Sequence, residues 1–86
     1  MEKAIFTPDH QRLCQMLREM RVERGLRQVD LAEALEVNQT FVSKYERGER
    51  RLDLIELRQV CEALGTDLLS FVGEFQSAEP RPAREH

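Results

Sequence analysis

The sequence predicts an all-α protein, a compact bundle of five short helices. Apolar residues recur at helical spacing in five successive segments, and capping residues or glycines stand between these segments. The 86 residues are 41% hydrophobic and 34% charged, which suits one domain around one modest core. We divide the chain into an N-terminal arm (1–6), a helical domain (7–75) and a disordered tail (76–86) whose prolines oppose regular structure.

The first helix is predicted to begin at Thr7-Pro8-Asp9. Thr7 suits the N-cap, Pro8 fits the first helical position, and Asp9 lies near the positive end of the helix dipole. Gly25 can end the helix in a left-handed conformation. The apolar stripe between these ends consists of Leu13, Met16, Leu17 and Met20.

Two shorter helices are predicted next, over residues 27–35 and 39–47. The second contains strand-favouring residues, but its apolar positions, counted from Val37, are spaced four, one and three residues apart, as in a helix. Asn38 is a suitable N-cap, and Gly48 follows the predicted end. The helix turns a polar and basic surface outward, formed by Gln39, Thr40, Ser43, Lys44 and Arg47.

A fourth helix is predicted between Asp53 and Gly65, and a fifth begins at Thr66 or Asp67. The fifth helix carries more apolar side chains than a small bundle can bury, so we expect a second copy of the chain to cover part of it. The predicted homodimer interface comprises Leu68, Leu69, Phe71, Val72 and Phe75.

The composition argues against several classes of protein. The first residues lack the apolar run of a secretory signal or a membrane span, so we expect a cytoplasmic protein. Cys14 and Cys61 form no close pair and are predicted to be reduced core residues. His10 and His86 are far from a ligand set in sequence, so no metal site and no cofactor are predicted.

Charge is distributed unevenly along the chain. The net charge is −3, which argues against indiscriminate nucleic-acid binding. Residues 39–51 nevertheless hold four basic and two acidic residues, a local charge of +2, whereas residues 53–79 hold one basic and six acidic residues. A basic edge on an acidic body can bind a polyanion in one orientation.

Residues 28–47 resemble the helix-turn-helix of the XRE (Cro/CI, phage-repressor-like) family of transcriptional regulators. Gln28 opens the first helix of the motif, Ala32 is the small residue where its two helices touch, and Val42 is the core residue of the second. The stretch "SKYERGER" closes the motif, and the resemblance extends over about residues 13–69. It implies a lambda-repressor-like bundle and sequence-specific binding of double-stranded DNA, most simply by a repressor.

The resemblance also assigns roles to the outer face of the helix over residues 39–47. Side chains near the start of a recognition helix reach base edges in the major groove, and Gln, Lys, Thr and Ser each have a use there. The matching base-facing positions are Gln39, Thr40, Ser43 and Lys44. Phe41 can either touch thymine methyl groups or pack against the loop before the fourth helix.

Phosphate contacts are expected on both sides of that helix. Gln28 lies at a helix start, where free N–H groups and the dipole favour a phosphate. Arg47, Arg50 and Arg51 lie at the far edge and are expected to contact the backbone across the groove.

Two further positions are singled out by the resemblance. Arg21 and Glu46 occupy places where the family often carries a partly buried salt bridge between the first helix and the recognition helix. Glu36 stands where the family usually has glycine, at a turn position that favours a left-handed backbone.

Two other classes of function remain as alternatives. The same scaffold could serve as a protein-interaction module, including an antitoxin-type partner-binding protein, but such a module would not need the basic surface or the Gln28 and Gln39 pair. An enzyme is not predicted, because His10 and Cys14, four residues apart, lack a third catalytic partner.

Overall fold

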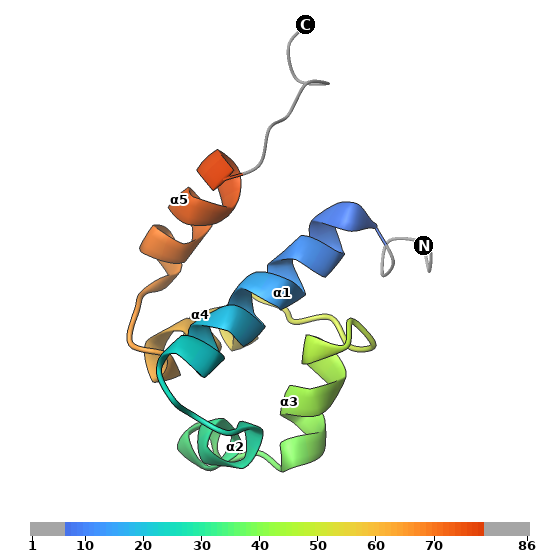
Figure 1. Ribbon diagram of the computed structural model, residues 1–86, viewed down its shortest axis with the longest axis vertical. Coiled ribbons are helices and arrows are strands. Elements are labelled where there is room, and N and C mark those ends of the chain that lie inside the picture. Colours follow the sequence, from blue (N-terminus) through green and yellow to red (C-terminus); the bar gives the residue numbers. More distant parts are fainter. Residues whose placement is uncertain (1–6, 79–86) are drawn as a thin grey trace, which may run out of the picture.

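The computed structural model describes residues 7–78, so the predicted arm (1–6) and residues 79–86 of the predicted tail lie outside the described part. Within it the chain forms five helices and no strand, which confirms the predicted all-α fold (Figure 1). The helices are α1 (Pro8–Glu23), α2 (Gln28–Leu35), α3 (Gln39–Glu46), α4 (Leu54–Ala63) and α5 (Leu68–Ala78).

The helix starts are fixed by local side-chain caps. The Thr7 hydroxyl accepts a hydrogen bond from the backbone N–H of His10 at 3.1 Å, and the Asn38 side chain accepts one from the Phe41 N–H at 3.3 Å. Asp53 caps α4 at 2.7 Å in the same way. These caps satisfy N–H groups that have no partner inside a helix. The three predicted N-caps are therefore confirmed.

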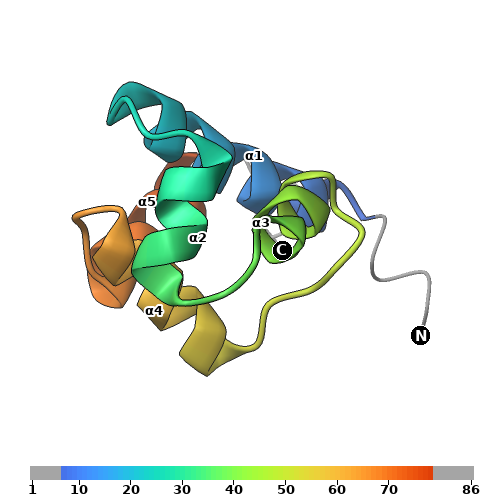
Figure 2. The ribbon, with the colours of Figure 1, turned by 90° about the horizontal axis from the view of Figure 1, so that it is seen from below.

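The helices pack around one core (Figures 1 and 2). In Figure 1, α2 and α3 lie at the lower end and α5 at the upper end, with α1 between them. Figure 2 shows α5 on the side of α2 away from α3. Burying the shared apolar faces stabilises helices that would be too short to persist alone. The largest fully buried side chains are Tyr45, Phe71, Leu17, Leu31, Leu64, Val42, Val60 and Cys61.

α5 is longer than predicted. It continues to Ala78, so residues 76–78, which the sequence assigned to the disordered tail, are helical. Arg12 of α1 holds this end: its Nη2 donates to the Phe75 carbonyl at 2.8 Å, and its guanidinium lies 4.0 Å from the centroid of the Phe75 ring. A contact between residues 63 apart in sequence adds stability that local propensity does not reveal.

The predicted dimer interface on α5 is partly wrong. Phe71 is only 1% exposed and belongs to the intrachain core, and Leu68 packs against that core. Phe75 is half-buried beneath Arg12. Leu69 and Val72, at 82% and 39% exposure, are the large apolar residues of α5 that remain exposed.

The turn between α2 and α3 contains a strained residue. Glu36 has φ 61° and ψ 42°, a left-handed conformation that costs a side-chain-bearing residue about 1–2 kcal/mol. Glycine adopts it without that cost but loses more chain entropy on folding. We expect Glu36→Gly to raise the free energy of unfolding by roughly 0.5–1 kcal/mol, measured by urea denaturation.

The matched control for this prediction is Glu33→Gly, at an exposed position inside α2. There glycine should lower the free energy of unfolding by about 1 kcal/mol. Destabilisation by both substitutions would contradict the assignment of strain to Glu36.

No helix among residues 7–78 is long and apolar enough to cross a membrane.

Candidate nucleic-acid interface

The two faces of α3 differ sharply in burial. Val42 and Tyr45 are fully buried, and they fix the rotation of the helix about its axis. Gln39, Thr40 and Lys44 are exposed on the opposite face. Ser43 is half-buried, and its hydroxyl donates to the Thr40 carbonyl at 3.3 Å. The residues predicted to face bases therefore share one accessible surface, which runs from Gln39 at the start of α3 to Lys44 in its last turn.

A buried ion pair joins α1 to the end of α3. Arg21 Nε donates to Glu46 Oε2 at 2.7 Å, and Arg21 Nη2 donates to Glu46 Oε1 at 3.0 Å. The two side chains are 10% and 3% exposed. The hydrogen bond to Glu46 raises the pKa of Arg21 above its ordinary value, so the guanidinium stays charged in the interior. The pair that the family resemblance assigned to Arg21 and Glu46 is thus present.

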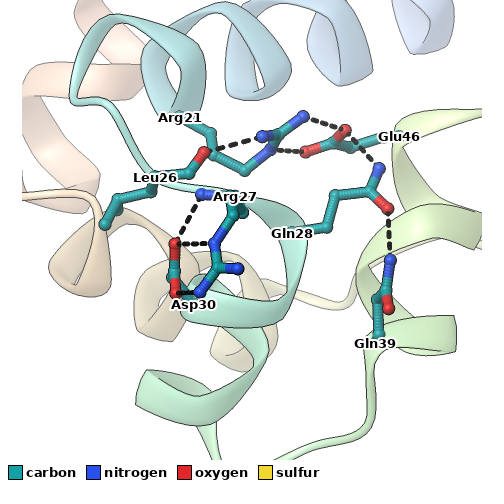
Figure 3. A network of polar contacts seen from close by, with 7 residues as sticks. All are labelled: Arg21, Leu26, Arg27, Gln28, Asp30, Gln39 and Glu46. Carbon is teal, nitrogen blue, oxygen red and sulfur yellow. Dashed lines mark hydrogen bonds and ion pairs between the residues drawn. The ribbon is translucent and has the colours of Figure 1, made fainter.

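Gln28 extends this ion pair to the exposed face of α3 (Figure 3). Its Nε2 donates to Glu46 Oε1 at 2.9 Å, and its Oε1 accepts a hydrogen bond from Gln39 Nε2 at 3.2 Å. The polar chain Arg21–Glu46–Gln28–Gln39 therefore runs from the interior of the bundle to the candidate reading surface.

This position gives Gln28 a role that sequence reasoning missed. We predicted a phosphate contact from its place at the start of α2, but its side-chain amide is engaged within the protein at both ends. The amide has a second N–H, so a phosphate contact stays a prediction. No spacing rule connects Gln28 to Gln39, and the folded turn brings them together.

Two of the three arginines at the far edge of α3 bind carboxylates of the chain. Arg47 contacts Glu49, and Arg50 contacts Glu56 through two hydrogen bonds of 3.1 and 3.0 Å. Arg51 is exposed in the loop that precedes α4. All three lie beside the end of α3, as their sequence positions predicted. Arg50 also links this loop to α4, which the sequence pattern did not indicate.

Phe41 packs against the loop before α4. The Arg50 guanidinium lies 4.4 Å from the centroid of its ring, and the Phe41 and Tyr45 rings form a T-shaped pair with their centroids 5.8 Å apart. Such contacts orient an aromatic ring as well as burying it. Of the two roles left open by the sequence, loop packing is the one that the free protein shows.

The His10 and Cys14 pair lies close together in α1. His10 Nε2 is 3.6 Å from Cys14 Sγ, but burial raises the pKa of the Cys14 thiol. Burial likewise raises the pKa of Cys61, to about 11. Both thiols are therefore protonated near neutral pH and are weak nucleophiles. In the part of the chain that the structure describes, His, Cys, Asp and Glu form no cluster of three that could hold a metal ion.

Comparison with known proteins identifies the family to which this arrangement of helices belongs. A helix-turn-helix family model matches residues 17–71, well over half of the chain. The chain belongs to the XRE-type helix-turn-helix family of transcriptional regulators. An XRE-family-like protein from Pseudomonas syringae pv. tomato is 38% identical with a TM-score of 0.81, over 92% of this chain and 96% of that one.

Two other relatives of this XRE-type chain are named as regulatory proteins. The restriction-modification controller protein C.AhdI from Aeromonas hydrophila is 30% identical, with a TM-score of 0.68, over 73% of this chain and 91% of that one. The HTH-type transcriptional regulator DdrOP3 from Deinococcus deserti is 39% identical over 54 residues, 63% of this chain. The chain spans only 42% of the length of DdrOP3.

Proposed function

We propose that this XRE-type chain is a sequence-specific DNA-binding repressor that occupies an inverted-repeat operator as a homodimer. The observation that carries the proposal is the polar face of α3, whose leading residue Gln39 is held by a hydrogen-bonded chain from a buried ion pair. A side chain held in this way loses little conformational entropy when it meets a base. The major groove admits one such helix.

Base reading is proposed for the exposed face of α3. Gln39 uses one amide hydrogen on Gln28, and its carbonyl oxygen and second N–H can meet N6 and N7 of adenine. Lys44 can donate to O6 and N7 of guanine. The Thr40 and Ser43 hydroxyls can donate or accept a hydrogen bond, so they can contact either base. Phe41 adds a thymine-methyl contact only where its ring edge reaches the groove.

Backbone contacts are proposed on both sides of the groove. Gln28 lies at the start of α2, and Arg47, Arg50 and Arg51 lie after α3. Phosphate contacts fix the orientation of the protein on the duplex but carry no sequence information. The local charge of +2 over residues 39–51 favours this approach over others, because the rest of the chain is acidic.

Dimerisation is proposed through the exposed apolar part of α5. Leu69 and Val72 are the exposed apolar residues there, and Phe75 on the same helix is half-buried. One helix-turn-helix reads few base pairs, and two copies about 34 Å apart would read both halves of an inverted repeat. The relatives named as a transcriptional regulator and a restriction-modification controller support the regulatory role.

The proposal is tested by selecting random duplex DNA with the purified chain at near-physiological salt. We expect the wild type to enrich an inverted repeat and the Gln39→Ala, Lys44→Ala double variant to enrich none. The matched control, Arg58→Ala with Gln59→Ala, removes exposed side chains from α4 and should enrich the same repeat.

Sedimentation in the same buffer completes the experiment. A dimer at tens of micromolar agrees with an inverted repeat, whereas a monomer that enriches single half-sites would contradict the dimer. A folded wild type that enriches nothing would contradict DNA reading and favour the protein-interaction alternative.

A further inference from the structure

The Arg47–Glu49 pair lies at the end of α3 and faces outward. Arg47 Nε and Nη2 donate to the two carboxylate oxygens of Glu49 at 3.1 and 3.0 Å. The side chains are 54% and 52% exposed, so both groups are accessible to a large partner. Arg47 is the C-cap residue of α3 and one of the proposed phosphate contacts.

Structural needs do not account for the Glu49 carboxylate. Glu56 also binds an arginine, but it caps α4 through the Asp53 N–H as well. Asp30 likewise caps α2 through the Arg27 N–H. Among residues 7–78, the hydrogen bonds of the Glu49 side chain go to Arg47 alone. An exposed ion pair of this kind contributes little to stability.

The geometry of the pair is that of phosphate binding. A guanidinium binds a carboxylate or a phosphate in the same way, through two parallel N–H donors. The interaction with Glu49 raises the pKa of Arg47, and the interaction with Arg47 lowers the pKa of Glu49, so both remain charged near neutral pH. The carboxylate therefore marks a position on the surface where an anion is bound by Arg47.

We propose that Glu49 occupies, in the free protein, the place that a DNA phosphate takes on Arg47 in the complex, and so competes with DNA. This inference rests on the proposed function. A phosphate that binds Arg47 must displace Glu49, and the freed carboxylate then lies near the negative backbone. Because phosphate contacts are the same for every sequence, this competition weakens binding to all duplexes.

The competition gives base contacts a larger share of the binding free energy. Lys44 in the recognition helix and the arginines after it attract any duplex through its phosphates. With Arg47 already paired, approach without base contacts gains less from the backbone. Glu49 thereby limits the time that the protein spends on unrelated DNA.

The test is the affinity of Glu49→Gln for a mixed-sequence duplex, measured by fluorescence anisotropy at three salt concentrations. At low salt we expect binding about three- to tenfold tighter than that of the wild type. The plot of log affinity against log salt should steepen by up to about 1, as expected for one more phosphate contact. The charge-matched control is Glu74→Gln, an exposed residue of α5, and it should change affinity by less than about twofold.

Arg47→Gln provides the decisive background. In a protein that already carries Arg47→Gln, the Glu49→Gln substitution should raise the affinity much less, because the Arg47 guanidinium that it would free is absent. Equal gains with and without Arg47, or equal gains for Glu49→Gln and Glu74→Gln, would overturn the inference and leave only an effect of net charge. A wild-type protein that binds duplexes as tightly as the Glu49→Gln variant would also overturn the inference. A wild-type protein that binds no duplex at low salt would overturn the proposed function, and the inference would fail with it.

Discussion

Replacing Glu46 with alanine is expected to lower the free energy of unfolding by about 3 kcal/mol. The Arg21 guanidinium would stay in the interior. Among the described residues, its remaining acceptor would be the Leu26 carbonyl, which lies 2.8 Å from Nη1. Gln28 would also lose the acceptor of its amide hydrogen. Removing one partner of a buried pair costs far more than the pair contributes, because the other charge is left uncompensated. Urea denaturation at neutral pH measures the loss.

The chain supplies a matched control for this prediction. Glu49→Ala also removes a carboxylate that an arginine grips through two hydrogen bonds, but both side chains of that pair are half exposed. Water can solvate the arginine that remains, so the free energy of unfolding should stay nearly unchanged. Equal effects of Glu46→Ala and Glu49→Ala would contradict the role of burial.

Local signals explain why the helix boundaries were largely predictable. Thr7, Asn38 and Asp53 act on N–H groups three residues ahead, so a short stretch of sequence contains both partners. The left-handed backbone of Glu36 was likewise foreseeable, since the family resemblance marks a glycine position there. The faces of α3 followed from apolar spacing alone.

Contacts between distant residues explain the failures. Phe71 was expected in a dimer interface because α5 is rich in apolar residues, and only the packed bundle shows which of these residues the chain itself buries. α5 extends to Ala78, and its last turns are contacted by Arg12, a residue far away in sequence that binds the Phe75 carbonyl. The candidate site divides in the same way: the exposed residues of α3 were predicted, whereas the carboxylate partners of Arg47 and Arg50 were not.

The hydrogen bond between Gln28 and Gln39 predicts coupled effects on DNA binding. On the duplex that the wild type selects, Gln39→Ala should weaken binding by about 1–3 kcal/mol, the usual loss for a bidentate base contact. Gln28→Ala should cause a smaller loss, because Gln39 is then no longer oriented by its 3.2 Å hydrogen bond. The double variant should bind about as weakly as Gln39→Ala alone. Anisotropy titrations of the four proteins give this cycle directly.

Salt dependence separates this coupling from a phosphate contact. If Gln28 acts by positioning Gln39, Gln28→Ala leaves the salt slope and the affinity for a scrambled duplex unchanged, because neither depends on base reading. Additive losses, together with weaker binding to both duplexes, would instead assign Gln28 to the backbone, as its place at the start of α2 first suggested. Because Gln28 also contacts Glu46, the unfolding curve of each variant must show that the protein remains folded at the assay temperature.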